Sequence, residues 1–260
     1  MSRRHAQSAE LVPRPIKLHT WAMTGTMRLT AEHLRLVHRD IADPGPIPGF
    51  AAMADADYAG LTERVLAERP VGPIAVFSYG SLLWRPAFAP MASIRATAPG
   101  WRRSFCLHLL RWRGTSDEPG LMMQIDRGGA CAGVLQLIDP AEERATLDFL
   151  WRREMSIKPP SNLPRWIEVE TPEGPRRAIA FTANRESPFY VGDLGTHETV
   201  QRLSRACGHL GSGAQYLYET VAALMGHGIE DEYLWNLQDQ VARAIEARFP
   251  GALAEAPPAA

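Results

Sequence analysis

A glutamate near the end of a predicted helix is the residue of this sequence best placed for acid–base chemistry. Segment 139–155, DPAEERATLDFLWRREM, predicts a helix whose apolar stripe is formed by Leu147, Leu150 and Trp151. Glu154 stands seven residues after Leu147 and continues this stripe. Burial and the negative end of the helix both disfavour a charged carboxylate, so we expect its pKa to lie above the ordinary value of about 4.3. Such a group can act as a general acid and base near neutral pH.

The alternative for this glutamate is a structural ion pair at the edge of the core. Arg103 is the partner that the sequence offers for such a pair. Arg152 and Arg153 belong to other faces of the same predicted helix, and we expect them to point elsewhere.

A second stretch, VFSYGSLLWRP at 76–86, reads as a buried strand that ends in a turn of small residues. Gly80 lets a ligand approach the backbone, and successive N–H groups after a strand can bind an anion. The stretch contains neither a Walker A loop nor GxGxxG. Ser81 lacks a GxSxG context and a suggestively spaced histidine, which argues against a serine nucleophile. A tight turn without a ligand is the alternative.

The surrounding elements predict an α+β fold. A strand is expected within 102–112, and two hairpins are expected around the turns RGGA (127–130) and TPEGP (171–175). Helices are predicted at about 31–40, 55–69, 140–155, 197–207, 214–225 and 230–248. Strict β-α-β alternation is absent, which favours an antiparallel or mixed sheet able to curl into a barrel, with helices around it.

Composition excludes several functional classes. The 260 residues are 45% hydrophobic and 22% charged, with a formal net charge of -1, so nothing indicates nucleic acid or an anionic membrane as a partner. No run reaches the ~20 apolar residues of a membrane span. The three cysteines form neither a disulfide framework nor a CxxC site, and the eight histidines are dispersed. We therefore expect a cytoplasmic protein with reduced thiols and no bound metal.

The chain divides into four predicted regions. Residues 1–26 are expected to be a disordered leader, and 27–70 to be an N-terminal helical extension. The functional domain is expected at 71–250, followed by a flexible Ala/Pro-rich tail at 251–260.

Six stretches then occur in a fixed order: FSYGSLLWRP, GWRRSFCL, RGTSDEPGLMMQIDRGGACAGV, LWRREM, GAQYLYETV and GIEDEYLWNL. Over about 74–240 they resemble the ChaC-type, glutathione-specific gamma-glutamylcyclotransferase family. The resemblance implies a gamma-glutamylcyclotransferase-like mixed barrel with peripheral helices. It also implies a cofactor-independent lyase that cleaves glutathione, a small-molecule substrate, into 5-oxoproline and Cys-Gly. By motif it assigns Glu154 as the catalytic acid/base. It assigns substrate binding to Tyr79, Gly80, Ser81, Leu82, Arg103 and Tyr216.

The residues suit this chemistry independently of the resemblance. In cyclotransfer the α-amine of the substrate attacks its own γ-carbonyl, so the protein needs a base and an anion anchor instead of a nucleophile. Glu154 and the backbone of Gly80–Leu82 could supply these two functions.

Three departures from the family pattern leave the substrate open. The loop at 156–165 is two residues longer than usual and lacks the family tyrosine, Gly213 replaces an asparagine, and Lys158 adds a basic side chain. The same cyclisation on other gamma-glutamyl amino acids or amines is therefore an alternative, as is a non-catalytic gamma-glutamyl-binding regulatory module. A hydrolase with Ser81 as its nucleophile is a further, less favoured alternative.

Overall fold

The computed structural model describes residues 25–253, and the fold is a closed β-barrel flanked by helices on two sides. Its five strands follow the order β2-β4-β3-β6-β7, and a parallel contact between β2 and β7 at Val76 and Ile179 closes the barrel. The other main pairings are antiparallel. The barrel strands are β2 (Ala75–Ser78), β3 (Ala92–Leu109), β4 (Gly120–Leu137), β6 (Asn162–Thr171) and β7 (Gly174–Ala183). The predicted α+β class with a mixed barrel is confirmed.

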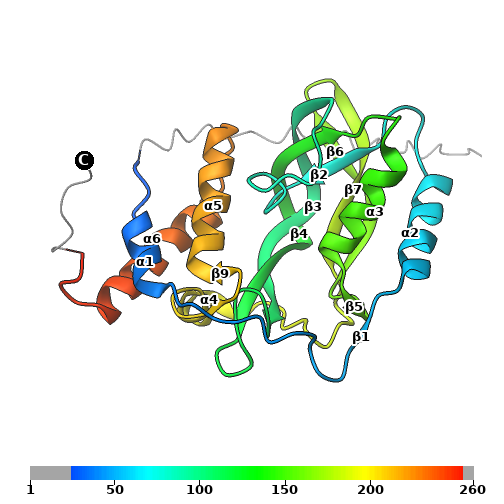
Figure 1. Ribbon diagram of the computed structural model, residues 1–260. Helices are drawn as coiled ribbons and strands as arrows, with labels where there is room; N and C mark the ends of the chain where they lie inside the picture. Colours follow the sequence, from blue (N-terminus) through cyan, green and yellow to red (C-terminus); the bar gives the residue numbers. More distant parts are fainter. Residues whose placement is uncertain (1–24, 254–260) are drawn as a thin grey trace, which may run out of the picture.

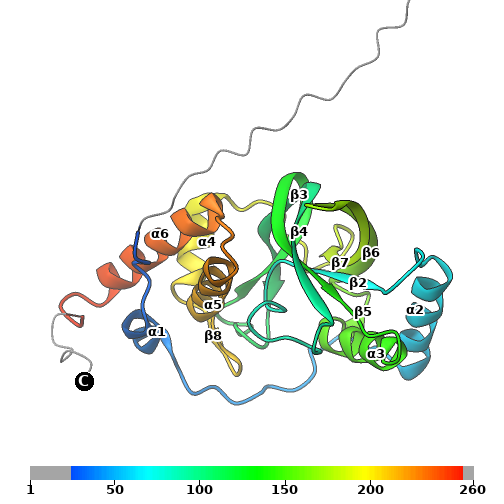
Figure 2. The same ribbon diagram turned by 90° about the horizontal axis from the view of Figure 1, so that it is seen from above.

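The helices form two groups on opposite sides of the barrel. Helices α1, α4, α5 and α6 gather on one side, while α2 and α3 lie on the other (Figures 1 and 2). Their bounds are α1 (Ala31–Val37), α2 (Asp55–Ala67), α3 (Glu143–Glu154), α4 (Gly195–Leu203), α5 (Gly213–Gly226) and α6 (Glu232–Arg248). Two short ladders add β1 (Ala51–Ala52) with β5 (Ile157–Lys158), and β8 (Cys207–Gly208) with β9 (Gly211–Ser212). All six predicted helices are present.

One predicted hairpin is wrong. The RGGA sequence at 127–130 is not a turn, because β4 runs without interruption and stays antiparallel to β3 along its length. Gly128 and Gly129 adopt φ values of 114° and 66°, and they lie beside a register shift at Gly100 of β3, whose φ is 77°. Glycines tolerate these angles, so the two strands bend together at a bulge instead of reversing.

The second predicted hairpin, between β6 and β7, is confirmed. Ile167 and Val169 of β6 are buried, whereas Glu168 and Glu170 are exposed, as the alternation predicts. Helix α3 begins at Glu143, later than the predicted start at about residue 140. The Asp139 carboxylate instead accepts the N–H of Ala141 at 2.9 Å in a turn before the helix.

The predicted helical extension attaches to both helix groups. Near its start, Arg28 pairs with Glu246 of α6 at 2.6 Å. Further along, Thr62 of α2 accepts the indole N–H of Trp151 of α3 at 2.9 Å. Between these points the chain crosses from one group to the other along one face of the barrel (Figures 1 and 2). Most of the predicted leader, 1–26, and of the tail, 251–260, lies outside the described residues.

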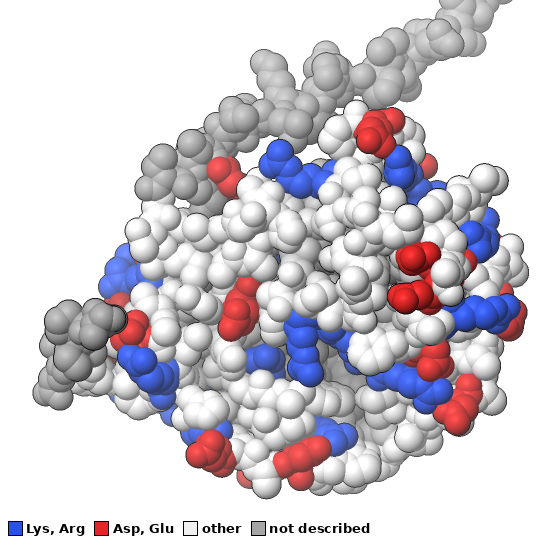
Figure 3. All heavy atoms as spheres, turned by 45° about the horizontal axis from the view of Figure 1, so that its top comes forward, with Lys and Arg blue, Asp and Glu red and all other residues white. Residues whose placement is uncertain are grey.

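Charged side chains of both signs are interspersed over the face in Figure 3, without a large area of one sign. Within residues 25–253, no three His, Cys, Asp or Glu side chains are grouped in a way that could hold a metal ion. In the same range, no helix has the length and hydropathy needed to cross a membrane.

Candidate active site

Glu154 lies at the C-terminus of α3, on the stripe that the sequence predicted. Leu147, Leu150 and Trp151 are fully buried against α2 and the barrel, so the stripe fixes the rotation of the helix. The Glu154 side chain retains 16% exposure. Burial raises its pKa above the ordinary value, and the neighbouring Arg153 guanidinium partly opposes this rise. A raised pKa lets a carboxyl group act as an acid as well as a base.

Arg153, which we expected to point elsewhere, belongs to the site. Its Nε lies 3.1 Å from Oε1 of Glu154. Its Nη2 donates to Oγ of Ser81 at 3.3 Å, and Nη1 donates to the carbonyl of Arg85. Arg153 therefore connects the glutamate to the turn that follows β2, and the sequence expectation for it was wrong.

The turn after β2 exposes backbone to the cavity, as the sequence suggested. The N–H groups of Leu83 and Arg85 donate to the carbonyls of Gly80 and Ser81 at 2.9 and 2.8 Å, which folds the chain tightly. A Cβ atom at Gly80 would stand 3.0 Å from the Tyr216 hydroxyl and 3.1 Å from Cε of Met123. A side chain would therefore crowd the cavity at this point.

Two tyrosines from different elements meet at this turn. The Tyr79 hydroxyl lies 2.5 Å from both Oε1 of Gln124 and the carbonyl oxygen of Phe181, inside the barrel. The Tyr216 hydroxyl, presented by α5, accepts from the backbone N–H of Ser81. Burial raises the pKa of Tyr216 to about 12 and that of Tyr79 well above its ordinary value. Both phenols are neutral at physiological pH and can donate hydrogen bonds.

Arg103 lies behind the turn and not in the cavity. Its Nε donates to the carbonyl of Tyr79 at 2.9 Å, and Nη2 donates to the carbonyl of Ala132 at 2.5 Å. Nη1 pairs with Asp231 at 2.6 Å, and the Arg103 side chain is only 1% exposed. The alternative pairing of Arg103 with Glu154 is therefore wrong. Arg103 supports the backbone of the turn from outside the cavity.

Arg113 lines the cavity and was not predicted as a site residue, although it is the first residue of the stretch RGTSDEPGLMMQIDRGGACAGV that carries the family resemblance. Its guanidinium lies 5.7 Å from the ring centroids of both Trp84 and Tyr216. Nη1 donates to the carbonyl of Ser212 at 3.0 Å. No carboxylate among residues 25–253 pairs with it within 4.0 Å. Burial lowers its pKa, yet an arginine stays charged at neutral pH, so it is available to an anionic ligand.

These groups open onto one cavity of about 620 Å³. The residues that face it come from the turn after β2, from β3, β4, β6, β7, α3 and α5, and from connecting loops that include the segment before α2. The predicted site residues that line it are Tyr79, Gly80, Ser81, Leu82, Glu154 and Tyr216. This volume is within the range of small-molecule sites.

The three departures from the family pattern differ in their relation to the cavity. The long loop contributes Ser156, Ile157, Ser161 and Asn162 to its lining. Lys158 instead pairs with Asp57 of α2. Gly213 does not line the cavity, and a Cβ there would stand 3.2 Å from Cα of Leu203. Only the loop can therefore alter substrate contacts directly.

The cavity is poorly suited to serine hydrolysis. Oγ of Ser81 accepts a hydrogen bond from Arg153 at 3.3 Å. His108 is the one histidine among the described residues that line the cavity, and it contacts Arg202 of α4. Within residues 25–253, no histidine is hydrogen-bonded to Ser81.

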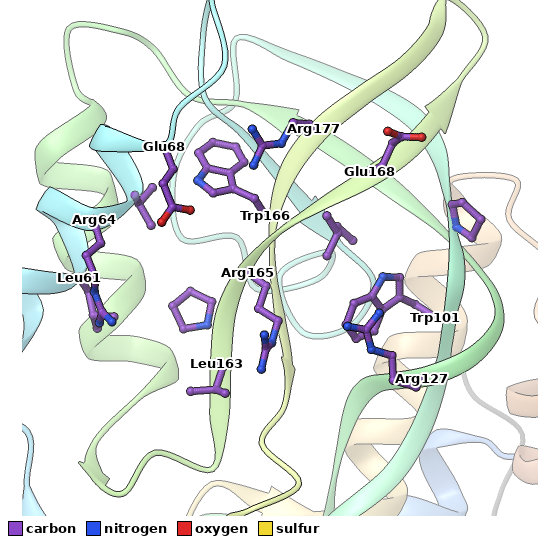
Figure 4. Close-up of a pocket in the computed structure, with 14 residues that line it drawn as sticks. Leu61, Arg64, Glu68, Trp101, Arg127, Leu163, Arg165, Trp166, Glu168 and Arg177 are labelled. Carbon is purple, nitrogen blue, oxygen red and sulfur yellow. The ribbon is translucent and has the colours of Figure 1, made fainter.

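A second hollow of about 690 Å³ lies between α2 and β6 (Figure 4). Trp101, Trp166 and four arginines, Arg64, Arg127, Arg165 and Arg177, face it. Arg127 packs 4.1 Å from the Trp101 ring and Arg177 packs 5.5 Å from the Trp166 ring. None of the predicted site residues lines this hollow, and its two carboxylates, Glu68 and Glu168, are exposed. The first cavity is therefore the candidate active site.

The family model of ChaC-like proteins matches residues 74–244. The chain belongs to the ChaC-like family. A glutathione-specific gamma-glutamylcyclotransferase from Escherichia coli is 35% identical to it over 198 residues, which cover 76% of this chain and 85% of that protein. Gamma-glutamylcyclotransferase 2-1 from Arabidopsis thaliana is 25% identical over 179 residues, covering 66% of this chain and 83% of that protein.

A solved structure of a relative supports the fold of this ChaC-like protein. The crystal structure of a yeast gamma-glutamyl cyclotransferase specific to glutathione superposes with a TM-score of 0.59 at 20% sequence identity. The match covers 67% of this chain and 100% of the yeast chain. The predicted gamma-glutamylcyclotransferase-like barrel is confirmed.

Proposed function

We propose that this ChaC-like protein is a gamma-glutamylcyclotransferase that cleaves glutathione into 5-oxoproline and Cys-Gly. One observation carries the proposal. Glu154, whose side chain is 16% exposed and whose pKa is raised by burial, shares a cavity with the Tyr79–Leu82 turn, to which Arg153 connects it. The related proteins from E. coli and yeast bear the name of this activity and substrate.

Binding orients the substrate for ring closure. The N–H groups of Gly80 and Leu82 in the turn after Tyr79 hold the α-carboxylate of the γ-glutamyl group, and the neutral Tyr216 hydroxyl, which accepts the N–H of Ser81, donates beside them. Arg113 holds a second carboxylate of the substrate, since it is buried and has no ion pair within the described residues. Holding both ends of the flexible tripeptide keeps its α-nitrogen close to its γ-carbonyl carbon. This proximity lowers the entropic part of the barrier to ring closure.

Glu154 then moves one proton in each of two steps. As a carboxylate it accepts a proton from the α-ammonium group, and the resulting amine attacks the γ-carbonyl carbon. As a carboxylic acid it returns this proton to the cysteinyl nitrogen as the C–N bond breaks, and the ring nitrogen passes its remaining extra proton to the departing amine, so that Cys-Gly leaves with an ammonium group and the ring becomes a neutral lactam. The products are 5-oxoproline and Cys-Gly, and the glutamate regains its starting charge. A carboxyl group with a raised pKa serves both steps.

The closest alternative is the same reaction on other gamma-glutamyl amino acids or amines. The long loop favours this alternative, because four of its residues line the cavity. A non-catalytic binding module is the second alternative. Glu154 argues against it, since a binding module has no need of a carboxyl group in this costly position.

Production of 5-oxoproline tests these possibilities directly. The full-length protein should release 5-oxoproline and Cys-Gly in equal amounts from reduced glutathione, as measured by mass spectrometry. Product only from gamma-glutamyl dipeptides such as γ-Glu-Ala would keep the reaction and change the substrate. Binding of glutathione without product would establish the binding module.

Replacing Arg153 should shift the pH dependence of the reaction. The Arg153 guanidinium lowers the pKa of Glu154 against the larger effect of burial, so Arg153→Gln should raise that pKa further. Because Glu154 must be ionised to accept the first proton, the acidic limb of kcat/KM should move to higher pH. A pH profile of 5-oxoproline release measures the shift.

Arg144→Gln is the matched control for this prediction. Arg144 lies on the same helix, is exposed and pairs with Glu63, so its loss should leave the acidic limb in place. An unchanged limb in Arg153→Gln would show that another group controls it.

A further inference from the structure

Trp112, which lines the cavity, has a backbone conformation that a bulky residue rarely adopts. Its φ is 67°, and no other non-glycine residue among residues 25–253 has a positive φ. Such a conformation costs roughly 1 to 3 kcal/mol for a residue with a large side chain, and it persists where the surroundings impose it. Residues in strained conformations concentrate at ligand sites, so this tryptophan suggests a function.

The surroundings hold Trp112 from two sides. Its carbonyl accepts the N–H of Leu210 at 2.7 Å. A Cβ at Gly208 would stand 2.4 Å from that same carbonyl oxygen, so the two backbones are in close contact. The Arg111 guanidinium lies 5.5 Å from the Trp112 ring and makes a two-point ion pair with Asp43, at 2.7 and 2.6 Å.

Trp112 lines the cavity together with the apolar residues Ile47, Leu109, Phe189 and Leu210, and we call these five residues the apolar wall. The Leu210 side chain is 45% exposed, so the wall reaches the mouth of the cavity. The ring centroid of Phe50 lies 4.7 Å from that of Phe189, so Phe50 packs against a residue of the wall. Ile47 and Phe50 precede residue 74, where the match to the family model begins.

The catalytic groups come from other elements. Glu154 is on α3, and the turn that would hold the γ-glutamyl group follows β2. Arg113, the proposed anchor for the other end of the substrate, directly follows Trp112 in sequence. The departing part of the substrate would therefore lie beside the apolar wall. Glutathione itself has only a thiol to place there, and burying an apolar group would gain about 0.8 kcal/mol per methylene.

We propose that the apolar wall binds an apolar substituent on the departing part of a gamma-glutamyl substrate, and that Trp112 determines this specificity. The substrate class is S-alkyl or S-aryl glutathione. The inference rests on the proposed cyclotransferase function. The bond changes are those of the parent reaction, and the products are 5-oxoproline and the S-substituted Cys-Gly.

Trp112→Gly separates a specificity role from a structural one. Glycine accepts a φ of 67° without strain, so the variant should fold with an unchanged or higher Tm. Its kcat/KM for S-hexylglutathione should fall at least about ten-fold. Its kcat/KM for glutathione should fall by a clearly smaller factor, because glutathione places no apolar substituent on the wall.

Leu210→Ala is the second variant, and it should lower kcat/KM for S-hexylglutathione in the same selective way. Its matched control is Met225→Ala on α5. The Met225 side chain is 47% exposed, close to the 45% of Leu210, and lies outside the cavity. The control should leave both substrates unaffected. Equal losses on both substrates in Trp112→Gly, or a wild-type enzyme inactive on S-hexylglutathione while active on glutathione, would overturn the inference.

Binding of S-hexylglutathione to the Glu154→Gln variant, measured by calorimetry, tests the apolar wall separately from the proposed cyclotransferase reaction. Absence of 5-oxoproline from every substrate would overturn the proposed function. Binding to Glu154→Gln that is weakened about ten-fold by adding Trp112→Gly would still support the apolar wall. No binding, or binding that is insensitive to Trp112, would overturn it.

Discussion

Glu154→Gln is expected to lower kcat for 5-oxoproline release from glutathione at least about 100-fold, the usual lower bound for loss of a general acid–base group. Glutamine is nearly isosteric but can neither accept the α-ammonium proton nor return it to the leaving nitrogen. Substrate affinity should change little, because the anchors on the turn and at Arg113 remain. Steady-state kinetics with 5-oxoproline as the product measures both quantities.

Glu154→Gln should lower the activity without lowering the thermal stability. Folding raises the pKa of Glu154, so the folded state favours the protonated carboxyl group. The contribution of this group to stability is present below its unfolded pKa and is lost as pH rises through the folded one. At pH 7, Glu154→Gln should therefore melt at the same temperature as the wild type or higher.

Asp148→Asn is the control for both measurements. Asp148 is on the same helix, pairs with Arg152 and is 45% exposed, so it should keep wild-type kinetics. A Glu154→Gln variant with more than about a tenth of wild-type kcat would place the proton transfers on another group.

Arg103→Met is expected to destabilise the protein by about 3 to 5 kcal/mol, the usual cost of removing one partner of a buried ion pair. The change leaves Asp231, which is 17% exposed, without its buried cation. It also leaves the carbonyls of Tyr79 and Ala132 without their donors. For a chain of this size we expect a fall in Tm of roughly 6 to 20 °C by thermal unfolding.

The neighbouring arginine provides a matched control. Arg102 precedes Arg103 on β3, points to the opposite face and is 42% exposed, with Asp193 as its partner at 3.5 Å. Arg102→Met should change stability by no more than about 1 kcal/mol. Equal effects of the two substitutions would show that the network around Arg103 does not hold the turn.

Local patterns predicted much of the fold. The apolar stripe of α3 and the alternation in β6 were readable because helix and strand periods are properties of neighbouring residues. The same reasoning failed at 127–130. A glycine pair suits both a hairpin turn and a bulge, and only the pairing of β4 with β3 on both sides of it decides between them.

The sequence by itself identified Glu154 as the candidate acid/base and predicted the turn that exposes backbone at Gly80–Leu82. It also contained the motifs of the family in their usual order. The stripe that carries Glu154 is local, and burial of this stripe is enough to raise the pKa of the carboxyl group. Only the tertiary structure decided which arginines serve the site. Arg113 enters the cavity, Arg153 bridges Glu154 to the turn, and Arg103 supports the turn from behind. A long guanidinium side chain can follow several directions from the same backbone position. Its direction is set by carbonyls and carboxylates that are distant in sequence, which no local period encodes.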